Sequence, residues 1–176
     1  MTQSPHDSLR QTLRALPDFP EKLPHFDPAG APSDPLELFR DWLGQALAAD
    51  LPQPHAFSLA TATPQGVASS RMLILKDIAG STLLFASARS SRKGRELHAN
   101  PVAAMNFYWH ALGRQVRFVG PVSLLPELDS TADWNDRPGA DGSENPQWQV
   151  YALAPQEAEF WQARSDRHHV RHRYAL

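Results

Sequence analysis

The 176-residue sequence contains no cysteine, which excludes disulfides, zinc–thiolate sites and thiol nucleophiles. It has no apolar run near the roughly 18 residues needed to cross a bilayer, and its N-terminus lacks the apolar core of a signal peptide. The formal net charge is only −2, so global charge does not favour nucleic acid or a membrane surface. We therefore expect a cytoplasmic protein in which any anion site depends on local clustering of charge.

Motifs of several large enzyme classes are absent as well. The sequence has no P-loop, no G-x-G-x-x-G and no Ser/His/Asp order, so NTPase, Rossmann and hydrolase interpretations lack local support. The histidines His168, His169 and His172 invite a metal interpretation. However, adjacent residues diverge on a strand, no acidic ligand completes the set and nearby arginines repel a cation. We predict no metal site.

Proline is abundant at the N-terminus, with seven prolines in the first 35 residues. This pattern predicts an extended arm over residues 1–33, with one or two helical turns around residues 9–16. Asp34 is placed as the N-cap of a helix that should run to about Ala49. The main domain is expected over residues 34–176. The apolar face expected for its first helix consists of Leu36, Phe39, Trp42, Leu43 and Leu47.

After this helix the hydrophobic period becomes strand-like, with short helices between the strands, which suggests an antiparallel barrel. The helices are expected at residues 91–100, where Ser90 or Ser91 can serve as the cap, and from 126 to 135. A polar loop with glycines and prolines should follow over residues 136–147. The expected strands are 56–62, 67–76, 82–87, 102–109, 114–125, 149–153, 159–163 and 169–174.

Two cationic stretches are candidates for anion binding. Ser87, Arg92 and Lys93 lie at a strand end and a helix start, where backbone N–H groups and the helix dipole favour a phosphate. A solvated helix face explains the same residues equally well. Arg71 and Lys76 should point to opposite faces of a strand, because they are five residues apart. They are therefore not expected to grip one phosphate together.

The C-terminal region offers a second set of binding residues. Arg167, His169 and Arg171 share one strand face by their spacing, which suits an anion, although a solvated basic C-terminus is the simpler explanation. Gln115 carries a donor and an acceptor for the edge of a heteroaromatic ring, or it faces solvent. Trp161 either stacks on a ligand ring or belongs to the core.

Five sequence motifs, taken in order, resemble the pyridoxamine 5′-phosphate oxidase family over roughly residues 34–174. They are Arg71-Met-Leu-Ile-Leu-Lys76, Ser91-Arg-Lys-Gly-Arg-Glu-Leu97, Asn106-Phe-Tyr-Trp109, Arg114-Gln-Val-Arg117, and Glu159-Phe-Trp-Gln162 through Arg167-His-His-Val-Arg171. The resemblance implies a mainly β fold with flanking helices, a six-stranded antiparallel split β-barrel. It also implies a homodimer with FMN at the interface, in which residues from about 148 to 176 serve dimerisation and substrate binding.

The resemblance further implies the oxidation of pyridoxamine or pyridoxine 5′-phosphate to pyridoxal 5′-phosphate, with oxygen as the acceptor. No residue is assigned as a catalytic acid or base. The implied FMN contacts are Arg71, Met72, Leu73, Lys76, Ala86, Ser87, Arg92, Lys93, Gln115, Trp161 and Arg171. The implied substrate contacts are Lys76, Arg137, Arg167 and His169.

The sequence departs from the family pattern on the substrate side. Asp133 stands where the family has a tyrosine, Asp141 stands where it has a serine, and a helix with a Gln-Ser flavin contact is missing after Pro138. Two carboxylates facing a dianionic phosphate are electrostatically adverse. A first alternative is therefore an FMN-dependent oxidoreductase acting on a different, less anionic ring compound. A second alternative is a non-enzymatic barrel that binds flavin or a partner.

Overall fold

The computed structural model describes residues 5–176, so residues 1–4 of the predicted N-terminal arm lie outside the described residues. In this range the helices are α1 (Pro5–Arg14), α2 (Pro35–Ala48), α3 (Arg92–Ala99) and α4 (Glu127–Asn135), with 3-10 turns η1 (Pro28–Gly30) and η2 (His110–Leu112). The strands are β1 (Ala56–Ala62), β2 (Ala68–Ile74), β3 (Asp77–Ala79), β4 (Thr82–Ala88), β5 (Val102–Trp109), β6 (Arg114–Leu124), β7 (Trp148–Leu153), β8 (Glu157–Gln162) and β9 (Val170–Ala175).

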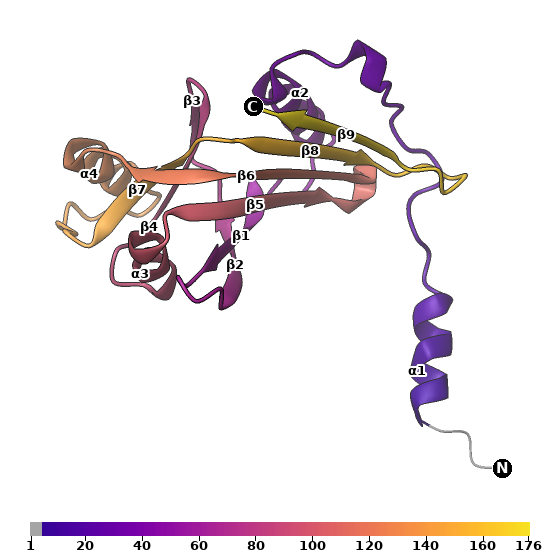
Figure 1. The fold of residues 1–176 in the computed structure, drawn as a ribbon, viewed down its shortest axis with the longest axis horizontal. Coiled ribbons are helices and arrows are strands. Elements are labelled where there is room, and N and C mark those ends of the chain that lie inside the picture. Colours follow the sequence, from indigo (N-terminus) through magenta and orange to yellow (C-terminus); the bar gives the residue numbers. More distant parts are fainter. Residues whose placement is uncertain (1–4) are drawn as a thin grey trace.

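The strands form one curled antiparallel sheet (Figure 1). Its main order is β2-β1-β5-β6-β7-β4-β3, while β8 pairs with β6 and carries β9 on its other edge. The β1–β2 hairpin turns at Gly66, whose φ of 81° favours glycine. The mainly β class predicted from the sequence is confirmed, and the polar segment 136–147 contains no helix or strand.

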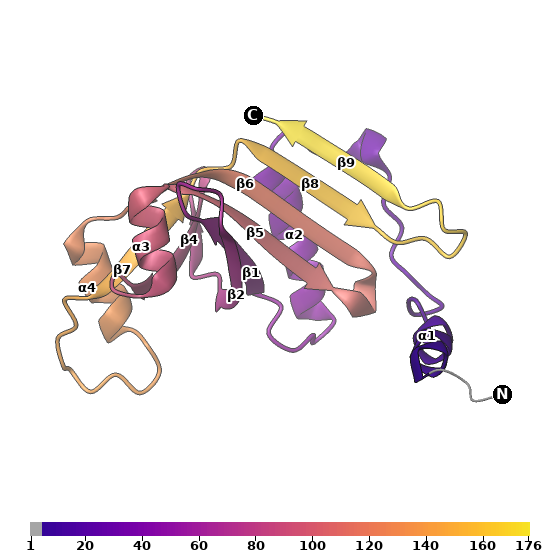
Figure 2. The same ribbon diagram turned by 60° about the horizontal axis from the view of Figure 1, so that its bottom comes forward.

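Gly120 lies where β6 changes its partner strand. Residues 114–119 of β6 pair with β8, whereas residues 122–124 pair with β7. A Cβ atom at Gly120 would lie 1.9 Å from the carbonyl oxygen of Ala154, so the close crossing of the β7–β8 connection requires glycine. The sheet consequently divides into one part that contains β8 and β9 and another that contains β7, β4 and β3 (Figure 2).

Helix α2 covers one face of the first part of the sheet (Figures 1 and 2). Asp34 caps it as predicted, because its carboxylate accepts a hydrogen bond from the Leu36 N–H at 2.8 Å. The ring of Phe39 packs on Phe107 and Phe118, with centroids 4.7 and 5.1 Å away. Burying each large apolar side chain contributes about 1.5–3 kcal/mol, so this face anchors the helix.

Arg114 joins α2 to the sheet from inside the core, where it is 2% exposed. Its guanidinium donates to Gln162 Oε1 and Gln45 Oε1, each at 2.9 Å, and lies 4.2 Å from the Trp42 ring centroid. Burial lowers the pKa of Arg114 to about 10. This first residue of β6 therefore has a structural role.

Three details differ from the sequence predictions. The sheet has nine strands, whereas the residue pattern predicted eight and the resemblance implied a six-stranded barrel; the strand absent from the predicted set is the short edge strand β3. Leu47 is 60% exposed, and Ala46 occupies the buried helix face in its place. The N-terminal arm carries the ten-residue helix α1 rather than one or two turns, and α1 projects away from the sheet (Figures 1 and 2). Within residues 5–176, no helix has the length and apolar character required to span a membrane.

Candidate functional site

Arg71 lies at the centre of a cationic cluster between β2 and α3. Its guanidinium donates to Thr61 Oγ1 at 2.6 Å and to Ser69 Oγ at 2.5 Å, and it lies 3.4 Å from Glu96 Oε2. The Arg71 side chain is 21% exposed, so one side of it remains open. Strand β2 and the neighbouring helix thus fix the direction in which this cation points.

Glu96 holds this cluster together from helix α3. It accepts hydrogen bonds from Thr61 at 2.5 Å and Ser69 at 2.7 Å, and its other oxygen pairs with Arg92 at 2.8 Å. The hydrogen bonds from Thr61 and Ser69, followed by Arg92, lower the pKa of Glu96 to about 2. The side chain is 6% exposed and is therefore a buried carboxylate. Sequence reasoning missed this residue, although its place in the Ser91–Leu97 motif was a usable signal.

Ser87, Ser91 and Lys93 complete the cluster at the start of α3. Ser91 Oγ accepts from the Gly94 N–H at 3.2 Å and lies 3.3 Å from Ser87 Oγ, so Ser91 is the cap. Burial and then the nearby charge of Arg71 lower the pKa of Lys93. The lowered pKa therefore reflects the partial burial of Lys93 first and the positive charge of Arg71 second.

We call Arg71, Ser87, Arg92 and Lys93 the cradle. Three of these residues are cations, and Glu96 is the one carboxylate that an ion pair joins to them among the described residues. Two positive charges are left uncompensated, which matches the charge of a phosphate dianion. The two hydroxyl groups of Ser87 and Ser91 and the free N–H groups of the first α3 turn add uncharged donors.

Gln115 and Trp161 face the opposite side of the sheet from Arg71. Arg71 is paired with Leu59, which is fully buried, so Arg71 projects on the core side of β2. Gln115 and Trp161 are paired with each other, and the following residue Val116 is buried in the core. Because side chains alternate along a strand, Gln115 and Trp161 project away from the core. A single chain therefore does not bring Gln115 and Trp161 next to the cationic cluster around Arg71.

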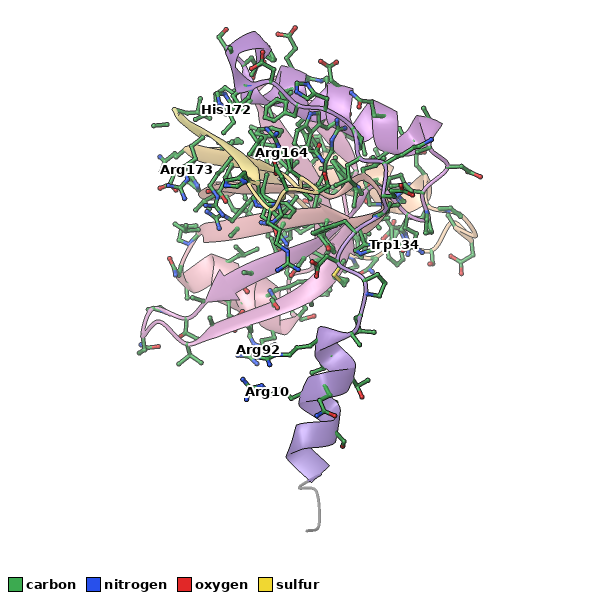
Figure 3. The ribbon with its side chains drawn as sticks, turned by 90° about the vertical axis from the view of Figure 1, so that its right-hand side faces the viewer. Arg10, Arg92, Trp134, Arg164, His172 and Arg173 are labelled. Carbon is green, nitrogen blue, oxygen red and sulfur yellow. The ribbon has the colours of Figure 1, made fainter. Side chains whose placement is uncertain are left out.

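Arg171 lies on this second face, on β9, beside the buried carboxylate of Glu159. Its Nε atom lies 3.3 Å from Glu159 Oε2, and Arg173 and Arg117 approach the same carboxylate at 2.6 and 3.7 Å. In Figure 3, Arg173 on β9 lies well apart from Arg92 of the cradle. Glu159 thus gathers three arginines, and it is a second site residue that sequence reasoning missed.

The remaining implied flavin residues divide between the two faces. Met72 is 65% exposed and pairs with Ser58, which puts it on the side away from Arg71. Leu73 is half-buried against the core cluster, and Ala86 is buried in β4 beside Ser87.

Lys76 forms an ion pair with Asp133 on helix α4, with 3.1 Å between Nζ and Oδ1. Strand β2 ends at Ile74, so Lys76 lies beyond the strand and the prediction from strand alternation does not apply to it. The indole N–H of Trp148 donates to the other Asp133 oxygen at 2.7 Å. Asp133, one of the two carboxylates expected to face a substrate phosphate, therefore neutralises Lys76.

Arg137 is held by aromatic rings rather than by a carboxylate. Its guanidinium carbon lies 3.1 Å from the Trp134 ring centroid and 5.3 Å from that of Trp148, and its Nε donates to the Trp134 carbonyl at 2.9 Å. Asp141 accepts from the backbone N–H of Ser143 at 3.0 Å. The hydrogen bonds to Ser143, and to a lesser degree the charge of Arg137, lower the pKa of Asp141.

Arg167 and His169 lie in the turn before β9, so the prediction that they share a strand face with Arg171 is wrong. Arg167 has a φ of 62° and pairs with Asp18 of the N-terminal segment at 2.9 Å. The His169 ring lies 4.8 Å from that of Trp161, and Phe19 packs on both, at 6.3 and 5.7 Å. The N-terminal segment thus covers this implied substrate region.

No cluster of three or more metal-ligating side chains was found among residues 5–176. The three-histidine sequence therefore brings no such set together in the described part of the chain.

Comparison with known proteins assigns this arrangement to a class. The split sheet matches a solved structure from Nostoc punctiforme described as a pyridoxamine 5′-phosphate oxidase-related, FMN binding protein, with a TM-score of 0.59. That chain is 15% identical, with 78% of this chain and 96% of the other covered, so it shows the fold alone. PhzG from Burkholderia lata, solved with tetrahydrophenazine-1-carboxylic acid, matches with a TM-score of 0.83 and 29% identity, covering 88% of this chain and 93% of PhzG.

The class is therefore the FMN-binding split barrel. A family model described as pyridoxamine 5′-phosphate oxidase matches residues 43–162. Pyridoxine/pyridoxamine 5′-phosphate oxidase of Nostoc punctiforme is 38% identical over 176 residues, covering 81% of this chain and 82% of that protein. A protein of the same description from Methylibium petroleiphilum is 35% identical, with 84% and 85% covered. The chain belongs to the pyridoxamine 5′-phosphate oxidase family and is an FMN-dependent oxidoreductase.

Proposed function

We propose that the protein oxidises pyridoxamine or pyridoxine 5′-phosphate to pyridoxal 5′-phosphate with oxygen as the electron acceptor. The observation that carries the flavin part is the excess of two positive charges in the cradle, between β2 and the start of α3. The substrate part is supported by the relatives of that description, which are 35–38% identical over four-fifths of the chain.

The cradle would hold the flavin phosphate. Arg71, which Thr61 and Ser69 already hold in place, and the partly buried Lys93 would supply charge-assisted hydrogen bonds to it. Gln115 would offer a hydrogen-bond donor and an acceptor to the edge of the flavin ring, and Trp161 would offer it an apolar surface. Bound FMN would supply the two-electron redox chemistry, and the residues of this chain would bind and orient the cofactor and the substrate.

We infer that the functional form is a homodimer, because one chain presents the cradle and the Gln115–Trp161 pair on opposite faces of its sheet. A second copy can bring its Gln115 and Trp161 to the cradle of the first. The face away from α2 exposes the apolar side chains of Met72 and Tyr108, which are 65% and 52% exposed. On the same face, the buried Oδ1 atom of Asn106 has no hydrogen-bond partner among residues 5–176. A partner covering this face would bury the apolar groups and could donate to Asn106.

Anaerobic titration tests the function. The purified protein should carry FMN, and adding pyridoxamine 5′-phosphate should bleach the oxidised flavin band near 450 nm, on the order of one equivalent per flavin. Admitting oxygen should restore the band. If the protein carries FMN but neither pyridoxamine nor pyridoxine 5′-phosphate bleaches the band, the proposed substrate is refuted and the cofactor assignment stays intact.

A second candidate is oxidation of a less anionic ring compound, and the Lys76–Asp133 ion pair favours it. Three implied substrate cations are already engaged: Lys76 by Asp133, Arg137 by Trp134 and Arg167 by Asp18. Displacing these partners costs part of the energy that a phosphate would contribute. The structural relative PhzG was solved with a ring compound that carries a carboxylate.

The two candidates are separated by a substrate panel. Reduced nitrogen heterocycles with one carboxylate, such as dihydrophenazine carboxylates, are compared with both B6 phosphates for the rate of anaerobic flavin bleaching. Faster bleaching by the carboxylates supports the second candidate, and faster bleaching by the phosphates supports the first.

A further inference from the structure

A cavity of about 750 Å³ lies between α3, the C-terminal end of β6 and strand β7. Its walls include Leu97 of α3, Pro101, and Val122 of β6, all apolar. None of the four cradle residues lines it. Its volume falls within the range of small-molecule sites in proteins.

Tyr151 of β7 brings a polar group to this apolar cavity. The residue is 2% exposed, and its ring stacks on Phe85 at a centroid distance of 5.2 Å and an angle of 13°, which fixes its position. Its hydroxyl has no hydrogen-bond partner among residues 5–176. The hydroxyl is not one of the fully enclosed polar atoms, so it is open to the cavity and can donate a hydrogen bond to a ligand that enters it.

The charges around the cavity are all of one sign. Arg89, Arg95 and His98 line it, and no carboxylate does so. Arg89 forms no ion pair with any residue in the described part of the chain, so its guanidinium is available. Burial raises the pKa of Tyr151, and the nearby positive charge of Arg89 partly opposes that rise. An anionic acceptor could contact both groups.

We propose that this cavity is a second binding site, separate from the cradle, for a small aromatic carboxylate. The carboxylate would accept the hydrogen bond of Tyr151 and pair with Arg89, while the aromatic body would lie against Leu97 and Val122. A phosphate monoester without an apolar body fits less well, because most of the wall offers no donors. The site would only bind the aromatic carboxylate, and no covalent step is proposed there.

Direct binding of 2-naphthoate to the FMN-loaded, full-length protein tests the proposal. Calorimetry should show saturable binding, and the neutral analogue 2-acetylnaphthalene should bind at least about tenfold more weakly, because it lacks the charge. Tyr151→Phe and Arg89→Ala should each weaken naphthoate binding by about threefold to tenfold. Arg40→Ala is the matched control, because Arg40 is an exposed arginine on α2 that does not line the cavity.

A second pair of variants avoids the core. Leu124 lines the cavity but is 57% exposed, so substitution there leaves the packing intact. Leu124→Glu should repel naphthoate and weaken its binding by about tenfold, whereas Leu124→Gln should change it by less than about threefold. The proposal would be overturned if the two variants bound naphthoate with equal affinity or if the protein showed no saturable binding. Release of FMN by naphthoate would overturn it as well.

Discussion

The carboxylate of Asp133 lies 3.1 Å from the ammonium group of Lys76, and this ion pair joins helix α4 to the segment that follows β2. Both side chains are largely buried, at 18% and 24% exposure. Trp148 also donates to Asp133, which fixes the carboxylate. Lys76 is the cation implied to contact both flavin and substrate, so its charge is partly cancelled before any ligand arrives.

Replacing Asp133 by Asn should therefore favour phosphate-bearing ligands. Asp133→Asn frees the Lys76 charge, and the Kd of pyridoxamine 5′-phosphate should fall by about threefold to tenfold. Perturbation of the flavin absorbance measures this Kd whether or not turnover occurs. Asp136→Asn is the control, since Asp136 is exposed and forms no ion pair in the described range. An unchanged Kd would mean that Lys76 does not face the ligand.

Glu96 should make stability depend on acid pH. Its folded-state pKa of about 2 lies below the ordinary value of 4.5, so its ionised form stabilises the fold above about pH 4.5. This contribution is lost progressively as the pH falls from 4.5 toward 2. Urea unfolding of Glu96→Gln and of the parent should differ most at neutral pH and converge near pH 2. A difference that stays constant over this range would contradict the assignment.

Arg114 should be needed for folding rather than for flavin binding. Arg114→Ala removes two hydrogen bonds from a buried cation and leaves the Gln45 and Gln162 oxygens without that donor. We expect the free energy of unfolding to fall by about 3 kcal/mol. Arg40→Ala, on the exposed face of α2, should change it by less than about 0.5 kcal/mol. Chemical denaturation measures both, and equal losses would refute a special role for Arg114.

Mixing two defective variants should restore flavin binding if the site is shared between copies. Lys93→Ala damages the cradle, and Trp161→Ala damages the opposite face. After equimolar refolding, half of the dimers are mixed and each has one intact site, so about a quarter of all sites should bind FMN. Each variant alone should bind little FMN at the same concentration. Failure of the mixture to exceed the separate variants would show that one chain supplies the whole site.

Much of the local structure could be predicted from residue patterns. Asp34 and Pro35 mark the start of α2, and Ser91 caps α3, because these residues satisfy free backbone N–H groups or suit the first helical position. The hairpin at Gly66 follows from a glycine that tolerates positive φ. Leu47 was misplaced because helical spacing alone does not define how wide the buried face is.

The mainly β class, the family motifs and the side chains able to bind an anion could be predicted, because they depend on residue type and local spacing. Which of the cations remain free depends on contacts between distant segments. Arg71, Glu96 and Lys93 meet because α3 packs beside the β1–β2 hairpin, while Asp133 reaches Lys76 from a helix 57 residues further along the chain (133 − 76). Electrostatic balance depends on distance in space, which residue spacing does not encode.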